Sequence, residues 1–258
     1  MMQCVANRRN AACLLRVHIR PMQKREASSA TRRTMVTTKR TPKRTPKRPS
    51  STEGEEPAAP EVDPDQHPAT LDDCRRCPLW ANATQGVPGA GPRRAPIMMV
   101  GEQPGDKEDL QGLPFVGPAG ALLDDALVEA GVGRKEVYVT NAVKHFKWTP
   151  RGKRRMHKTP GQREVDACRY WLDQELESVG AHVIVALGAT ALKAVLEDPK
   201  SRLQDAIGKV IEHGDRLVVA TYHPSFALRA PDPETRHRAY AAIVAALQDA
   251  KKLAQRRK

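Results

Sequence analysis

Four apolar runs, separated by segments with helical periodicity, constrain the fold of this 258-residue chain more than any other feature. Alternating strand-like and helical segments are typical of an α/β domain with a mainly parallel sheet. We therefore expect a three-layer α/β/α domain around a central, mainly parallel four-stranded sheet. The strands are expected at residues 97–100, 137–141, 183–187 and 217–221, and the helices at 119–130, 162–178, 189–196 and 234–254.

Polar residues follow each of these runs. The first run leads into Gly101-Glu102-Gln103-Pro104-Gly105-Asp106, the second ends at Asn141, the third precedes Gly188, and the fourth precedes His223-Pro224-Ser225. Because ligands of parallel sheets bind beyond the carboxyl ends of the strands, Glu102, Asn141 and His223 should share one site. The first turn lacks the glycine spacing of a dinucleotide fingerprint or a Walker loop. An exposed turn carboxylate at Glu102 and a helix-capping or packed histidine at His223 remain open alternatives.

A strongly basic segment follows the second run. Residues 144–158 hold seven Lys or Arg and no acid, and they include Lys153-Arg154-Arg155-Met156-His157. We expect a basic loop in which cations hold a phosphate backbone and one imidazole is placed for nucleophilic attack. This combination favours covalent chemistry on nucleic acid. The alternative is a solvated surface loop that contains a histidine by chance.

The charge is distributed unevenly along the chain. Residues 1–50 hold 14 Lys or Arg and one acid, whereas residues 51–73 hold eight acids and no base. We interpret residues 1–68 as a disordered basic arm and acidic spacer, and residues 69–258 as the folded domain. The arm would add sequence-independent affinity for nucleic acid. Open alternatives are an idle tail, a later start at Met22 or Met35, and a transit peptide.

Cysteine usage points to a metal site. The five cysteines do not suit a secreted disulfide framework. Cys74 and Cys77 form a chelating CxxC pair, Cys168 is a third candidate ligand, and His145 is the best fourth. The spacing does not separate zinc from an iron–sulfur cluster, and free buried cysteines remain an alternative.

Six short motifs of the chain can be read together. They are Cys74-x-x-Cys77, Gly101 to Asp106, Gly112-Leu113-Pro114-Phe115-Val116-Gly117, Thr140-Asn141-Ala142-Val143-Lys144, Leu187-Gly188 and His223-Pro224-Ser225. In combination they resemble the uracil-DNA glycosylase superfamily, most closely its iron–sulfur family 4 and, within that neighbourhood, the crosslinking UdgX branch. The resemblance covers about residues 71–254. Three departures from family 4 favour the crosslinking branch: Gln103 where a glycine is usual, the inserted segment 153–157, and His145 where family 4 has a cysteine ligand.

The resemblance implies a role for each residue of the site. Phe115 would stack on a flipped-out uracil, Asn141 would read its edge, and His223 would bind a carbonyl of the departing base. Gln103, Gly105 and Asp106 would complete the substrate-binding set. Glu102 would stabilise the cationic sugar, and His157 would attack its anomeric carbon to leave a stable covalent adduct, so that the enzyme turns over once. Lys153, Arg154, Arg155 and Lys158 would bind DNA, and Arg154, Arg155 and Lys158 would keep His157 neutral.

The resemblance also implies a structural [4Fe-4S] cluster held by Cys74, Cys77, His145 and Cys168. Expected partners are uracil-containing, single-stranded DNA and no membrane, for a monomer in the bacterial cytoplasm, associated with the nucleoid through DNA. Two alternatives stay open. One is a conventional family 4 glycosylase that releases abasic DNA, and the other is a non-catalytic, metal-containing DNA-binding module.

Overall fold

The computed structural model describes residues 60–256, and most of the predicted arm lies outside this range. We predicted that the arm and spacer are disordered up to residue 68. The last residues of the spacer, however, contact the folded domain. The carbonyl of Glu61 accepts a hydrogen bond from the indole of Trp80, and the ring of His67 packs edge-on against Tyr170 at 5.4 Å between centroids. The folded part therefore begins before residue 69, because these two contacts already hold the spacer.

A five-stranded sheet forms the centre of the domain, in the order β2-β1-β5-β7-β6. Four strands are parallel, and the edge strand β6 pairs antiparallel with β7. The four predicted strands are confirmed, but the predicted number was one too low. The missed strand has exposed and half-buried residues in alternation, so it carries no apolar run. The strands are β1 Ile97–Gly101, β2 Val137–Asn141, β5 Val183–Leu187, β6 Val210–His213 and β7 Arg216–Thr221.

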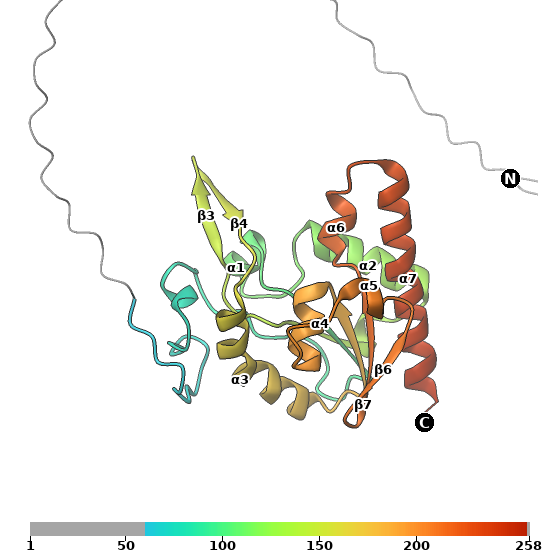
Figure 1. Cartoon of the computed structure of the whole chain (residues 1–258), viewed down its shortest axis with the longest axis horizontal. Coiled ribbons are helices and arrows are strands. Elements are labelled where there is room, and N and C mark those ends of the chain that lie inside the picture. The colour runs from blue at the N-terminus through green and yellow to red at the C-terminus, as the bar shows by residue number, and fades with distance from the viewer. Residues whose placement is uncertain (1–59, 257–258) are drawn as a thin grey trace, which may run out of the picture. The chain divides into compact units, whose positions relative to one another are not determined.

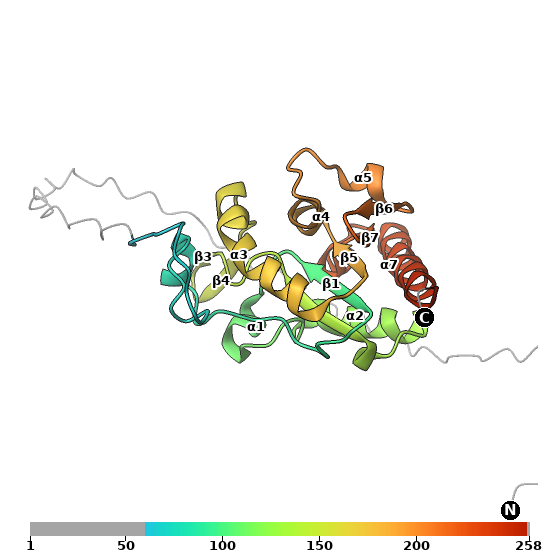
Figure 2. The same cartoon turned by 90° about the horizontal axis from the view of Figure 1, so that it is seen from below.

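Helices cover both faces of this sheet (Figures 1 and 2). Alternate residues of β1 pack to opposite sides, Ile97 and Met99 against α2 (Pro118–Ala130) and α7 (Pro233–Gln255), and Met98 and Val100 against α3 (Gln162–Val179) and α4 (Ala189–Leu196). Both sets are buried, as expected for a central strand of a parallel sheet. The predicted three-layer α/β/α architecture is confirmed, and each of the four predicted helices begins and ends within one residue of its expected bounds.

The basic segment is a hairpin and not the loop that we predicted. β3 (Trp148–Arg151) and β4 (Arg154–His157) pair antiparallel, and Trp148 lies opposite His157. The two-residue turn begins with Gly152 at φ +60°, a conformation that glycine adopts without steric cost. In Figure 1 the hairpin projects from the domain beside α1. It carries His157 at its C-terminal end, so the position of the imidazole is set by strand pairing.

Short elements complete the described chain. They are η1 Pro78–Ala81, α1 Asp106–Gln111, η2 Arg134–Glu136, α5 Leu203–Ala206 and α6 Pro224–Leu228. Both α1 and α6 begin directly after a strand of the central sheet and its turn, so they bring their first residues to the edge where the parallel strands end. Among the residues that the structure describes, no helix has the length and apolar character needed to cross a bilayer.

Candidate active site

A cavity of about 670 Å³ lies at the carboxyl edge of the sheet. Glu102 after β1, Asn141 at the end of β2 and His223 after β7 all line it, and so do Phe115 and His157. These five residues come from five different segments of the chain. The sheet edge and the hairpin together therefore bring into one cavity the groups that we predicted to act on a base and its sugar.

Glu102 and His157 face each other in this cavity. Nε2 of His157 lies 3.4 Å from Oε1 of Glu102, and the other carboxylate oxygen, Oε2, accepts a hydrogen bond of 2.6 Å from Oγ1 of Thr190. The Glu102 side chain is 22% exposed and that of His157 is 44% exposed. The carboxylate is thus held on one side and directed at the imidazole on the other, while both groups stay accessible to a ligand.

Burial is the main cause that lowers the pKa of His157 below its usual range. Glu102 opposes this shift, and the positive charge of Arg229 adds to it. We predicted that Arg154, Arg155 and Lys158 keep the imidazole neutral, and this explanation is wrong. The cation responsible is Arg229, which lies after α6 and also lines the cavity.

His223 caps α6 and lines the cavity as well, so the capping alternative and the site prediction hold together. Its Nδ1 accepts the backbone N–H of Ser225 at 3.2 Å and lies 2.8 Å from the Ser225 hydroxyl oxygen. Burial lowers the pKa of His223 to about 4, with Arg229 and His157 as further causes. A neutral ring whose Nδ1 accepts a hydrogen bond carries its proton on Nε2, so the free nitrogen is a donor.

Phe115 and Asn141 meet at Gly101. A Cβ atom on Gly101 would lie 2.3 Å from Oδ1 of Asn141 and 2.7 Å from Cζ of Phe115, so only glycine fits there. Phe115 itself has φ +56°, which is uncommon for a non-glycine residue, and its ring stacks on that of His223 at 6.0 Å between centroids. The aromatic face and the amide therefore occupy fixed positions in the cavity wall.

Glu108 is a site residue that we did not predict. It is 8% exposed, lines the cavity, and accepts the backbone N–H groups of Gly105 at 3.1 Å and of Gly117 at 2.7 Å. It therefore joins the turn after β1 to the loop that carries Phe115. The three-residue spacing from Gly105 to Glu108 is that of a helix capping box, and this was the available signal in the sequence.

Gln103 joins the two ends of the hairpin. Its Nε2 donates to the carbonyls of Lys147 and Lys158 at 3.1 Å each, and its Oε1 accepts the N–H of Lys147 at 3.1 Å. We predicted that Gln103 binds substrate. The structure uses its amide to close the base of the hairpin, although the residue also lines the cavity.

Arg155 is turned toward α1. Its guanidinium forms ion pairs with Asp106 at 2.6 Å and with Asp109 at 2.5 Å, and it lies over the ring of Phe146 at 5.4 Å. We predicted phosphate contacts for Arg155 and substrate contacts for Asp106, but these charges are paired with each other. Lys153, Arg154 and Lys158 are exposed, and no side-chain partner is found for them within residues 60–256. They remain the candidates for phosphate binding.

Three of the four predicted metal ligands are buried thiols. Cys74, Cys77 and Cys168 form no disulfide, and burial raises the pKa of Cys77 to about 11 and of Cys168 to about 12. All three lie close enough for their charges to interact. The backbone N–H of Lys144 donates to the sulfur of Cys168 at 3.2 Å, and the indole of Trp171 donates to that of Cys74 at 3.3 Å.

Buried thiols with N–H donors directed at sulfur suit a thiolate-held iron–sulfur cluster. His145 is buried, and desolvation lowers its pKa to about 4, which keeps the imidazole in the neutral form that binds metals. Its Nε2 lies against Gly86. Within the described residues, no group of three or more His, Cys, Asp or Glu side chains is arranged to hold a single metal ion. The three buried thiols supply the sulfur donors that an iron–sulfur cluster uses.

Residues 88–250 match the family model described as the uracil DNA glycosylase superfamily. The chain belongs to this superfamily. It is 41% identical over 164 residues to a type-4 uracil-DNA glycosylase of Thermotoga maritima. The aligned region covers 63% of this chain and 82% of that relative. It is 38% identical over 165 residues to a type-4 uracil-DNA glycosylase of Archaeoglobus fulgidus, and the aligned region covers 61% of this chain and 79% of that relative. A type-5 uracil-DNA glycosylase of Pyrobaculum aerophilum is 32% identical over 178 residues, with 61% and 73% covered.

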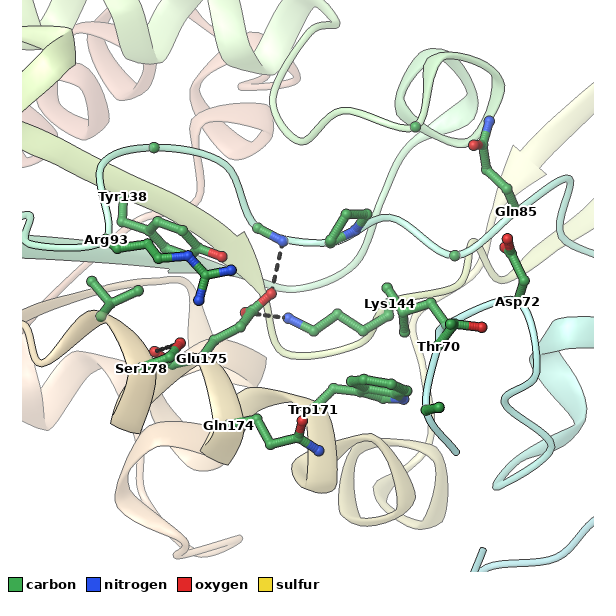
Figure 3. A pocket seen from close by; sticks show the side chains of 18 residues that line it. Thr70, Asp72, Gln85, Arg93, Tyr138, Lys144, Trp171, Gln174, Glu175 and Ser178 are labelled. Atoms are coloured by element: carbon green, nitrogen blue, oxygen red, sulfur yellow. Dashed lines mark hydrogen bonds and ion pairs between the residues drawn. The ribbon is translucent and has the colours of Figure 1, made fainter. Parts of the chain in front are cut away.

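A buried lysine connects the glycosylase-superfamily site to the cysteines. The ammonium of Lys144, whose side chain is fully buried, donates to Oγ1 of Thr140 at 2.6 Å, to the carbonyl of Asn141 at 2.8 Å and to Oε2 of Glu175 at 2.6 Å. Oε1 of Glu175 accepts the N–H of Gly89 at 2.7 Å. Figure 3 shows the ion pair of Lys144 with Glu175 in the wall of a second cavity, of about 780 Å³. One of the seven cations that we assigned to the basic segment is therefore a buried structural group.

Proposed function

We propose that this superfamily member excises uracil from DNA in repair and becomes covalently joined to the abasic sugar through His157. The observation that carries the proposal is the distance of 3.4 Å between Nε2 of His157 and the carboxylate of Glu102 in a cavity that also holds Asn141, Phe115 and His223. An imidazole beside this carboxylate lies next to the place that we assign to the sugar, where a nucleophile must approach the anomeric carbon. The likeness to type-4 and type-5 uracil-DNA glycosylases supports uracil as the base.

Recognition of the base uses the walls of the cavity. The ring of Phe115 supplies an apolar face for a flipped-out pyrimidine, and stacking offsets part of the cost of unpairing it. The amide of Asn141 donates to one uracil carbonyl and accepts from the ring N–H, a pattern that cytosine does not match. Nε2–H of His223 donates to the other carbonyl and stabilises the negative charge that develops on the leaving base.

Bond cleavage and capture follow from the charges at the sugar. As the N-glycosidic bond breaks, its electron pair leaves with uracil, and C1′ becomes cationic. The carboxylate of Glu102 stabilises this cation. The unprotonated ring nitrogen of neutral His157 donates its lone pair to C1′ and forms the new N–C bond. The imidazolium then loses its remaining N–H proton, which neutralises the uracil anion. The product is neutral uracil and a protein joined to the sugar.

The cluster has a structural part in this proposal. Cys74, Cys77, Cys168 and His145 would hold a [4Fe-4S] cluster, which joins residues 74–77 to α3 and to the entrance of the hairpin. We expect anaerobically purified protein to be brown and to absorb visible light, whereas a zinc site is colourless. Cys168→Ser should lose the absorption and lower the melting temperature. Colourless wild-type protein with stoichiometric zinc would contradict the cluster.

The crosslink is tested on a denaturing gel. Wild-type protein and uracil-containing single-stranded DNA should give a slower band that survives boiling, and His157→Ser should give no such band while it still releases some uracil. His237→Ser, which alters an exposed histidine of α7, is the matched control and should behave as wild type. Alkali-cleavable abasic DNA without the band would favour a conventional family 4 glycosylase. Binding without uracil release would favour a non-catalytic DNA-binding module.

Three further expectations stay predictions: a preference for single-stranded DNA, a monomeric state, and a location in the cytoplasm in association with the nucleoid. The first can be measured in the same gel with matched single-stranded and double-stranded substrates. Sedimentation of the free protein addresses the second.

A further inference from the structure

We propose that Thr190 is a positioning residue that fixes the carboxylate of Glu102, so that one of its oxygens faces His157 and the reacting sugar. The inference rests on the proposed function, because it assigns the means by which the carboxylate of that site is held. The hydrogen bond of 2.6 Å from Oγ1 of Thr190 to Oε2 of Glu102 is the observation that carries it.

The backbone around Thr190 brings the hydroxyl to this place. Thr190 is the second residue of α4, whose N-cap Gly188 has φ +94° and donates its N–H to the carbonyl of Thr221 at 2.8 Å. A Cβ atom on Gly188 would lie 3.2 Å from Cβ of His223, so the turn is packed closely against the histidine. The start of α4 is therefore fixed to β7 and to the cavity wall, and the Thr190 hydroxyl has little freedom to move away.

The direction of the hydrogen bond is determined by the groups. A carboxylate only accepts, so the Thr190 hydroxyl donates, and the interaction is a charge-assisted one. Within residues 60–256, the Glu102 side chain has only two partners, Thr190 at Oε2 and His157 at Oε1. The main chain of Glu102 is held separately, because its carbonyl accepts the N–H of Val143 at 3.0 Å. Thr190 is thus the group that fixes the rotation of the carboxylate.

The consequence concerns the rate of both reactions. If the hydroxyl is removed, the carboxylate rotates, and Oε1 no longer lies in a constant position beside the imidazole and C1′. Misplacement of a reacting group by about 1 Å costs about 100-fold in rate. We expect Thr190→Val to slow uracil release and adduct formation by about 10-fold to 100-fold in single-turnover experiments, with the affinity for uracil-free DNA within about twofold of wild type.

The test compares variants that differ in one hydroxyl. Thr190→Ser keeps the donor and should restore rates to within a few-fold of wild type. Thr190→Ala removes the donor without the bulk of valine and should show the same loss, so that a folding defect of one variant does not decide the result. Ser178→Ala is the matched control: it removes an exposed hydroxyl of α3 that does not line the cavity of Glu102, and it should leave both rates unchanged.

A Glu102→Ala background distinguishes positioning from a general structural role, because alanine leaves no acceptor for the Thr190 hydroxyl. If Thr190 acts through Glu102, Thr190→Val should have no further effect on a protein that already carries Glu102→Ala. An equal loss in both backgrounds would overturn the inference, and so would wild-type rates in Thr190→Val and Thr190→Ala. If wild-type protein releases no uracil and forms no adduct, the proposed function itself fails, which is a separate and recognisable result.

Discussion

Arg155 fastens the β3–β4 hairpin to α1 through two ion pairs that differ strongly in burial. The Asp109 side chain is fully buried, whereas that of Asp106 is 49% exposed, and Arg155 is 20% exposed. Breaking a buried pair leaves an uncompensated charge and costs about 3 to 5 kcal/mol, while an exposed pair contributes about 0 to 1 kcal/mol. Two contacts from the N–H of Thr84, at 2.9 and 3.1 Å, still stabilise Asp109 when the guanidinium is gone. We therefore expect a coupling of about 2 to 3 kcal/mol between Arg155 and Asp109, and below about 1 kcal/mol between Arg155 and Asp106.

Two double-mutant cycles measure these couplings. Arg155→Met is combined with Asp109→Asn in one cycle and with Asp106→Asn in the other, and the free energy of unfolding is obtained from urea denaturation. Arg155→Met should also slow adduct formation more than uracil release, because His157 is carried by the hairpin, whereas Asn141 and His223 are carried by the central sheet and the turn that follows it.

Equal couplings in the two cycles would refute the assignment of the hairpin's attachment to the buried pair. An unchanged rate of adduct formation in Arg155→Met would show that the hairpin holds His157 in place without this attachment. Either result would indicate that the hairpin is held mainly by Gln103, which joins its two ends independently of Arg155.

Other expected outcomes concern buried groups. Lys144→Met should destabilise the fold by about 3 to 5 kcal/mol in urea denaturation, because it leaves Glu175 unpaired, and Lys144→Met combined with Glu175→Leu should recover part of the loss. The pKa of His223 is about 4 in the folded protein, so the unfolded chain binds a proton between about pH 6.5 and 4 that the folded protein does not bind. Stability should be greatest above pH 6.5 and fall by about 2 to 3 kcal/mol toward pH 4.5, and His223→Gln should lack this contribution. Thr221→Val should raise stability by about 1 kcal/mol, because the hydroxyl that it removes has no partner in the described residues.

The parallel part of the sheet was predictable because strands that are buried on both faces have continuous apolar sequences. β5 is buried on both faces and reads Val-Ile-Val-Ala-Leu, a pattern that needs no knowledge of the rest of the fold. The edge strand β6 and the hairpin strands were not predictable in this way. Their residues are largely exposed, so they carry polar sequences, and they become strands only through pairing with a neighbour.

The residues of the site can also be separated into those that the sequence predicts and those that it does not. Glu102, Asn141 and His223 could be predicted to share a cavity because each follows a parallel strand, and such strands end at one edge. Thr190 and Arg229 could not be predicted. Each reaches the site from a helix or its end, and the contact depends on helix placement, which leaves no periodic signal in the sequence. Gln103 and Arg155 were assigned to ligands because a polar side chain near a site has the same sequence signature whether it binds substrate or holds the hairpin.

Two neighbouring residues of the β1–α1 turn set the position of His157. Glu102 faces the imidazole at 3.4 Å, and Gln103 holds the two backbone positions, Lys147 and Lys158, between which the hairpin emerges. Glu102 interacts with the imidazole and Gln103 supports the hairpin that carries it. Because the two residues are neighbours, both move with the same short stretch of backbone. A displacement of this turn would keep Glu102 and His157 in register with each other while it shifted both relative to His223. A change within the hairpin would instead separate His157 from Glu102. Capture of the sugar should consequently be more sensitive to the hairpin, and recognition of the base more sensitive to the turn.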